Sequence, residues 1–167
     1  MRWSGFVLSM ALLLFGSGIV SPPPMAIAQP ATPSATTTLK LVEHAVHLTT
    51  VDHGDPGPSV GDVQVWGPNP LYDEHDNADT GATTQGICTA LNAAFDCIVT
   101  ETIVFADGST LQIQGVEFAT MPSRRTIVGG SGAYLGATGT VSVEPTRDQS
   151  RWAKQLWFQQ RQSMACA

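Results

Sequence analysis

The sequence predicts one all-β domain, and three features of the 167-residue chain support this class. Segments of alternating apolar and polar residues, rich in Val, Ile and Thr, recur from residue 39 onward, while helical periodicity is almost absent. Gly, Pro and Asp residues separate these segments. Evenly spaced short strands are typical of a β-sandwich or a closed β-barrel, and a chain that is 43% apolar at this length builds one compact core.

About eight strands are expected. The first is the long alternating stretch Leu39–Val51, and the second is Val60–Trp66, which the Gly67–Pro68 turn bounds. Six more follow: Thr83–Asn92, Asp96–Phe105, Thr110–Phe118, Arg124–Val128, Ala137–Glu144 and Lys154–Gln160. Between the fourth and fifth strands, Ala106-Asp107-Gly108 predicts a hairpin turn, because Asp-Gly readily takes positive φ. Eight strands that close into a barrel enclose room for side chains or for one small ligand.

The segment Ile127–Gly139 contains five glycines and then resumes strand-like alternation. Glycine allows positive φ and close backbone contacts, so the segment predicts a tight corner. A flexible loop and a phosphate-binding loop are the alternatives. The phosphate-binding reading is disfavoured, because such a loop leads into a helix, whereas here β-forming residues follow.

The N-terminal region resembles a secretion signal. Arg2 supplies a positive charge, Gly5–Val20 is apolar, and Ala26-Ile27-Ala28 offers small residues for cleavage. We therefore expect a signal peptide over 1–28, a disordered linker over 29–38, a folded domain over 39–162 and a tail over 163–167. An uncleaved anchor helix is the alternative. The mature protein is expected to be secreted or periplasmic, with no membrane attachment after cleavage.

The charges and cysteines restrict the possible partners. The chain has 8 Lys and Arg against 14 Asp and Glu, and no basic stripe, which disfavours nucleic acid as a partner. Cys88 and Cys97 flank a short loop between two predicted strands, so we expect a disulfide across this hairpin in an oxidising compartment. Cys166 is left over. The four histidines are scattered, and no metal site is predicted.

Short motifs follow one another in a definite order: Gly61-Asp62, Asn69-Pro70-Leu71-Tyr72, Gly81, Gly86-Ile87-Cys88, Gln114-Gly115, the run from Ile127 to Gly132, and Gly136-Ala137-Thr138-Gly139. The series resembles the allene oxide cyclase and dirigent superfamily. The resemblance implies an eight-stranded antiparallel, calycin-like β-barrel that forms a homo-oligomer, a trimer or a dimer. It also implies an apolar cavity for a flexible hydrophobic molecule, and no cofactor.

The resemblance also implies roles for individual residues. Glu43 matches an acid that steers charge in the substrate, and Asn69 matches an asparagine that helps to hold the substrate oxygen, so both are candidate catalytic residues. Cys88 matches a cavity cysteine, although a disulfide would remove its thiol from such a role. The chain departs from the pattern at Ala45, where an asparagine is expected, and at Glu117, where a tyrosine is expected.

The residues themselves suggest further candidates. A carboxylate inside an apolar barrel has a raised pKa, which suits proton transfer, and this applies to Glu43, Glu101 and Glu117 if they point inward. For Glu101 and Glu117, the solvated outer face is the expectation from alternation. An inward Glu43 would turn Val42, Val46 and Leu48 outward and require cover from another subunit.

Aromatic and basic residues complete the list of candidates. Trp66, Tyr72 and Tyr134 are candidates for the cavity mouth, where they and Glu117 would contact the substrate, with core packing as the alternative for the rings. Arg124 and Arg125 are expected on a solvated hairpin, with a contact to a carboxylate on a substrate as the alternative.

The leading hypothesis is an exported, cofactor-free barrel that binds a small hydrophobic molecule and directs its cyclisation or stereoselective coupling, as an isomerase, a cyclase or a dirigent-like protein does. A non-catalytic carrier with the same cavity is the alternative, and a solid structural barrel is a third possibility. An inward acid beside Asn69 in an open cavity would favour the barrel that directs a reaction. An open cavity lined only by apolar residues would favour the carrier, and a filled interior would favour the structural barrel.

Overall fold

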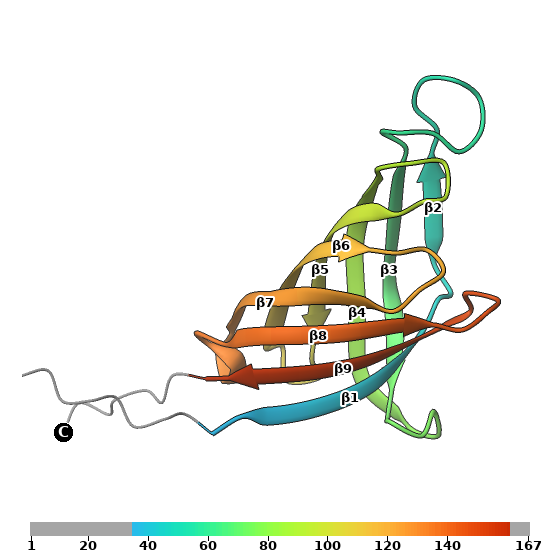
Figure 1. Cartoon of the computed structure of the whole chain (residues 1–167). Helices are drawn as coiled ribbons and strands as arrows, with labels where there is room; N and C mark the ends of the chain where they lie inside the picture. The colour runs from blue at the N-terminus through green and yellow to red at the C-terminus, as the bar shows by residue number, and fades with distance from the viewer. Residues whose placement is uncertain (1–34, 161–167) are drawn as a thin grey trace, which may run out of the picture. The chain divides into compact units, whose positions relative to one another are not determined.

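The computed structural model describes residues 35–160, which form β-strands and one short 3-10 helix (Figure 1). The predicted signal peptide, the tail, Cys166 and most of the predicted linker lie outside the described residues. Among residues 35–160, no helix is long and apolar enough to cross a membrane. The elements are β1 (Thr37–His44), β2 (Leu48–Val51), β3 (Val63–Tyr72), β4 (Asp79–Ala90), β5 (Cys97–Val104), β6 (Thr110–Glu117), β7 (Ser123–Ser131), η1 (Gly132–Tyr134), β8 (Thr138–Pro145) and β9 (Arg151–Gln159).

The strands close into an antiparallel barrel (Figure 1). Their order around the sheet is β1-β9-β8-β7-β6-β5-β4-β3-β2, and β1 also pairs with β3, where Val42 lies opposite Tyr72. β2 pairs with the first half of β3, so β1 and β2 together occupy one of eight positions around the barrel. The predicted all-β class, the single domain and the eight-stranded antiparallel barrel are confirmed.

The predicted strand boundaries differ from the observed ones at several ends, and two of these errors lie at the same place. The predicted strand Leu39–Val51 is interrupted at Ala45–His47, where the Asn69 side chain replaces backbone pairing: its Oδ1 accepts hydrogen bonds from the backbone N–H of Val46, at 3.2 Å, and of His47, at 2.8 Å. The Gly67–Pro68 turn does not end the second strand, because β3 bulges between Trp66 and Asn69 and then continues. A break and a bulge on neighbouring strands therefore frame one buried asparagine.

The barrel interior is layered. Its closed end is filled by a large apolar cluster that includes Leu41, Ile103, Ile113, Leu156 and Phe158. The glycine-rich corner covers this end, since Tyr134 of η1 packs on Phe105 with ring centroids 4.3 Å apart. The opposite end carries a small cluster of Cys88, Cys97 and Val99 beneath Trp66. Between the clusters lies a layer of buried charged side chains, so the apolar filling occupies only part of the barrel.

The predicted disulfide between Cys88 and Cys97 is confirmed; it joins β4 to β5 within the small cluster that these cysteines form with Val99. Because it closes a loop with a sequence separation of 9, it removes chain entropy from the unfolded state. Replacing both cysteines with serine is expected to lower the free energy of unfolding by about 2–3 kcal/mol. Equilibrium unfolding with and without dithiothreitol measures this. The reductant should destabilise only the wild type, and an equal response of both proteins would contradict the prediction.

Candidate functional site

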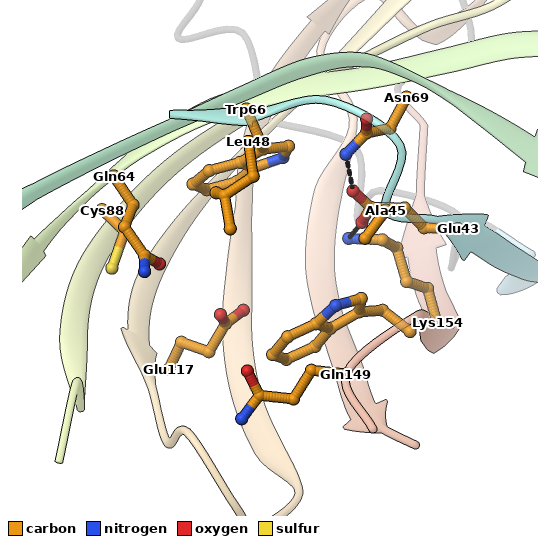
Figure 2. Close-up of a pocket in the computed structure, with 11 residues that line it drawn as sticks. Glu43, Ala45, Leu48, Gln64, Trp66, Asn69, Cys88, Glu117, Gln149 and Lys154 are labelled. Atoms are coloured by element: carbon orange, nitrogen blue, oxygen red, sulfur yellow. Dashed lines mark hydrogen bonds and ion pairs between the residues drawn. The ribbon is translucent and has the colours of Figure 1, made fainter. Parts of the chain in front are cut away.

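A pocket lies at the end of the barrel that carries the small cluster of Cys88, Cys97 and Val99, away from η1. Figure 2 shows the side chains that line it. It holds about 550 Å³ of free space, its open mouth included, and the centres of water-sized molecules can occupy about 80 Å³ of it. Its walls include Leu48, Trp66, Cys88 and Trp152, and its polar groups come from Glu43, Gln64, Asn69, Glu117, Gln149 and Lys154. The dimensions suit a ring-sized part of a small molecule, and the lining combines aromatic surface with a few charged groups.

Trp66 owes its place in the wall to a glycine on the next strand. Gly86 lies directly opposite Trp66 in the β3–β4 pairing. A Cβ atom at Gly86 would lie 2.5 Å from Cζ2 of the indole and 2.6 Å from the backbone oxygen of Thr100. Only glycine lets the ring rest on the sheet at this point, which gives a physical reason for the glycine in the Gly86-Ile87-Cys88 motif.

The floor of the pocket is an ion pair held by an amide. Lys154 Nζ lies 2.9 Å from Glu43 Oε2, and Asn69 Nδ2 donates a 2.7 Å hydrogen bond to Glu43 Oε1 (Figure 2). Asn69 also holds the strand break through its Oδ1, so one side chain positions both the backbone at the pocket edge and the Glu43 carboxylate. Glu43 therefore points inward.

The ion pair continues into the barrel. Lys154 Nζ lies 2.5 Å from Glu101 Oε1, which also accepts a 2.6 Å hydrogen bond from Thr84 Oγ1. Arg125 connects the other side: its Nη1 lies 2.8 Å from Glu101 Oε2 and its Nη2 lies 3.1 Å from Glu117 Oε2. These two contacts are ion pairs without hydrogen-bond geometry. The network thus runs from Glu43 through Lys154, Glu101 and Arg125 to Glu117.

Three expectations from the sequence are wrong here. Glu101 and Glu117 are not on a solvated face, and Arg125 is not on a solvated hairpin: Glu101 and Arg125 are buried, and Glu117 lines the pocket. Glu101 and Arg125 follow the inward parity of their strands, since Glu101 lies between Val99 and Ile103, and Arg125 precedes Ile127 by two residues. The expectation of a solvated position fails because each of these buried charges meets a partner of opposite sign inside the barrel.

The network contains three carboxyl groups but only two cationic side chains. Burial raises the pKa of Glu101, but Lys154 and Arg125 outweigh it and hold the pKa lowered, at about 2. Burial lowers the pKa of Lys154, but Glu101 and Glu43 outweigh it, so the pKa is raised. Burial raises the pKa of Glu117, and its single contact with Arg125 does not reverse this. Glu117 therefore binds a proton more readily than an ordinary glutamate does, and it faces the pocket.

The structure brings together some of the predicted site residues. Glu43, Asn69, Trp66 and Glu117 all line the pocket. Tyr72 lies outside the lining and stacks on His44, with ring centroids 3.8 Å apart, and Tyr134 lies at the closed end. Val46 and Leu48 are each 58% exposed. Leu48 lines the pocket (Figure 2), so the expectation that it lies on the outer face is wrong.

Sequence reasoning assigned no site role to Lys154, Trp152 or Gln149, which also line the pocket. Lys154 lies on β9 between Trp152 and Leu156, which both point into the barrel. The alternation of Lys154 with these two apolar residues is the sequence feature that indicates an inward lysine.

Comparisons with known proteins identify relatives of this fold. The family model described as Dirigent-like protein matches residues 29–156. A comparison with curated proteins found no match.

Solved structures show the same architecture at low sequence identity. Pyocyanin demethylase is 21% identical, with a TM-score of 0.63 over 73% of this chain and 99% of that chain. The pterocarpan synthase dirigent protein GePTS1 is 20% identical, with a TM-score of 0.65 over 83% of this chain and 92% of that chain. The Diels Alderase AbmU from Streptomyces koyangensis is 19% identical, with a TM-score of 0.58 over 78% of this chain and 70% of that chain. These likenesses show a shared fold.

Proposed function

The chain belongs to the Dirigent-like protein family, and on this premise we propose that it binds a small hydrophobic molecule in its barrel and directs the cyclisation or stereoselective coupling of that molecule. One observation carries the proposal: the pocket has aromatic walls and a carboxylate, Glu43, that Asn69 and Lys154 hold in place. The neighbours described as a pterocarpan synthase dirigent protein and a Diels Alderase support this class of reaction.

In the proposed mechanism the pocket restricts the conformers of its guest. Trp66 and Trp152 would hold the apolar body against the wall, which removes entropy from the barrier and keeps water away from a reactive intermediate. Glu43 and Glu117 both line this space, and each would act on the guest through its carboxyl group. We propose Glu43 as a catalytic residue. Asn69, whose amide holds Glu43, is proposed as the residue that positions it.

A retention experiment tests the proposal. The purified protein is incubated with an extract of its host, and bound and altered compounds are identified by mass spectrometry. We expect a compound whose retention is lost in Trp66→Ala but kept in Trp157→Ala, a tryptophan outside the pocket lining. Conversion of the compound to a product of unchanged mass would indicate cyclisation. Loss of this conversion in Glu43→Gln would assign a role in the reaction to the Glu43 carboxylate. Retention without any conversion would indicate a carrier, and no retention would contradict both functions.

The raised pKa of Glu117 predicts a pH dependence of stability. A pKa raised above its ordinary value of 4.5 means that the folded protein binds this proton more tightly than the unfolded chain does. The contribution is therefore present below pH 4.5 and is lost as the pH rises through the raised pKa. As the pH rises through this range, the wild type should lose this contribution to its free energy of unfolding. Glu117→Gln has no titrating group at this position, so its stability relative to the wild type should increase. Chemical unfolding across pH measures the difference, with the exposed Glu144→Gln as control, and parallel profiles would contradict the prediction.

We also propose that the protein is exported and forms a homo-oligomer. The disulfide and the family support an oxidising, extracellular setting. The outer face of β3 to β6 carries neighbouring apolar side chains, since Val65 pairs with Ile87 and Ile98 pairs with Val116, and all four are exposed. A second copy of the chain would cover this face.

The outer face supplies a direct test of assembly. Ile98→Lys is expected to convert a dimer or trimer to monomer, because a charge would be buried in the contact. Size-exclusion chromatography with light scattering measures the mass. Val128→Lys, on the outer side of β7, should leave the mass unchanged. A wild-type monomer would overturn the proposal.

A further inference from the structure

A second hollow adjoins the pocket at its mouth. We call it the outer hollow; it is lined by Ala119, Thr120, Pro145, Thr146, Arg147 and Gln149, and holds about 600 Å³ of free space with its open side included. It lies between the β6–β7 loop and the β8–β9 loop. Gln149 lines both the pocket and the outer hollow, so this side chain lies between the two spaces.

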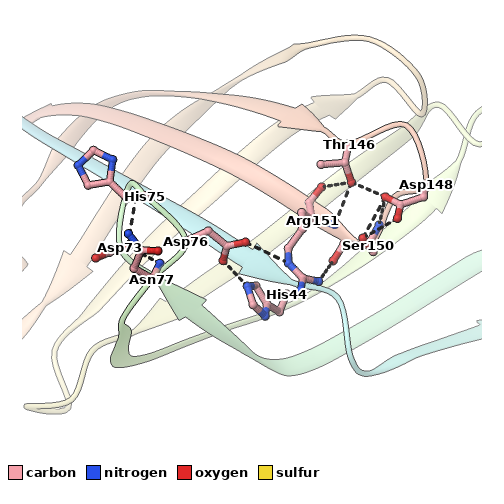
Figure 3. Close-up of polar contacts among 9 residues, drawn as sticks. All are labelled: His44, Asp73, His75, Asp76, Asn77, Thr146, Asp148, Ser150 and Arg151. Carbon is pink, nitrogen blue, oxygen red and sulfur yellow. Dashed lines mark hydrogen bonds and ion pairs between the residues drawn. The ribbon is translucent and has the colours of Figure 1, made fainter.

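The loop that carries Gln149 is held in one shape by its own hydrogen bonds (Figure 3). Asp148 Oδ1 accepts from Thr146 Oγ1 at 2.7 Å and from Ser150 Oγ at 2.9 Å, and Thr146 N–H donates to the Arg151 carbonyl oxygen at 2.9 Å. Gln149 has a φ of 56°, an uncommon conformation for a residue other than glycine. Its Nε2 donates to the Ala119 carbonyl oxygen at 3.2 Å, which ties the two loops together across the mouth.

The outer hollow contains an unpaired cation. Among the lysines and arginines of residues 35–160, Lys40, Arg125, Arg151 and Lys154 pair with carboxylates, and Arg124 lies 5.9 Å from the Trp157 ring. Within that part of the chain, Arg147 alone has no such partner. The adjacent Asp148 carboxylate is engaged by Thr146 and Ser150. An exposed guanidinium with free donors suits a carboxylate, sulfonate or phosphate.

We propose that the outer hollow binds an anionic group of the ligand whose apolar body occupies the pocket, with Arg147 as the charge that selects it. The inference rests on the proposed function and narrows the substrate class to hydrophobic molecules that carry an acidic group. The ligand would span Gln149, which separates the two spaces. The chain has a formal net charge of −6, so the protein as a whole repels anions and a local cation is needed to admit one.

Two fluorescent probes with similar rings test the proposal. 1-Anilinonaphthalene-8-sulfonate carries an anionic group, and N-phenyl-1-naphthylamine is its uncharged counterpart. Arg147→Gln is expected to raise the dissociation constant of the sulfonate by about three- to fivefold, the range of an exposed charge pair, and to leave that of the uncharged probe unchanged. Arg147→Glu should weaken the binding of the sulfonate further. Added salt should reduce the difference between the wild type and Arg147→Gln.

Two further variants separate the possible failures. Arg124→Gln removes an arginine outside both spaces, and it should leave the binding of both probes unchanged. Equal losses in Arg124→Gln and Arg147→Gln, or equal effects on the two probes, would overturn the subsite. Trp66→Ala should weaken the binding of both probes. If it weakens the binding of neither, the pocket is not the binding site and the proposed function fails as well. Loss of uncharged-probe binding in Trp66→Ala without any Arg147 effect would overturn the subsite alone.

Discussion

Replacing Lys154 with methionine is expected to lower the free energy of unfolding by about 3–5 kcal/mol, the largest effect of any substitution considered for this protein. Lys154 Nζ contacts Glu43 at 2.9 Å and Glu101 at 2.5 Å, and all three side chains are buried. Methionine keeps the approximate length and the apolar stem of the lysine side chain, but it leaves two carboxylates without their shared cation. The cost comes from the uncompensated charges that remain. Denaturant unfolding at neutral pH measures it.

A matched substitution and a double variant identify the cause. Lys40→Met removes a lysine whose ion pair with Glu74 is half exposed, and it should cost less than about 1 kcal/mol. Glu43→Gln combined with Lys154→Met should recover part of the loss, because one uncompensated charge is gone. A Lys154→Met protein as stable as Lys40→Met would show that the buried network does not contribute as described.

The effect of Lys154 should also depend on pH. The pKa of Glu101 is lowered from 4.5 to about 2, so its stabilising contribution is present above pH 4.5 and is lost as the pH falls towards about 2. The gap between the wild type and Lys154→Met should narrow over that interval, because a protonated Glu101 no longer needs the cation.

Asn69→Asp is expected to be the second most damaging substitution, with a loss of about 3–4 kcal/mol at neutral pH. The new side chain has the same shape, but an oxygen replaces the Nδ2 that donates to Glu43 Oε1 at 2.7 Å. A donated hydrogen bond becomes a contact between two carboxylates. Lowering the pH should restore stability, because the introduced carboxyl then takes up a proton. Denaturant unfolding at two pH values measures both effects.

The β4–β5 turn provides a control with the same chemistry at a more exposed position. Asn92 Nδ2 donates to Asp96 Oδ2 at 2.9 Å, and this contact is only partly buried. Asn92→Asp should cost less than about 1 kcal/mol, since water can solvate both carboxylates there. Equal losses at the two sites would mean that the burial of Asn69 does not matter. A pH-independent loss in Asn69→Asp would point to packing as the cause.

Local features of the chain were sufficient to predict the fold class and several structural details. Alternation and turn residues predict an all-β domain, the glycine-rich segment predicts a corner, and the spacing of Cys88 and Cys97 predicts the bond that joins β4 to β5. These predictions succeed because each depends on residues close together in the sequence. The motif order added the closed barrel, and with it an inward Glu43 beside Asn69 as the candidate site.

The composition of the site depends on contacts that no local pattern contains. Its charged groups come from five strands, β1, β5, β6, β7 and β9, and the Glu101–Lys154 pair is 53 residues apart. Alternation places Glu101 and Lys154 on one of two faces, but it does not say that a cation will meet a carboxylate there. Burial of a charge becomes favourable only once its partner is present. Closure of the barrel brings these partners together, and so the tertiary structure alone determined that this interior is charged.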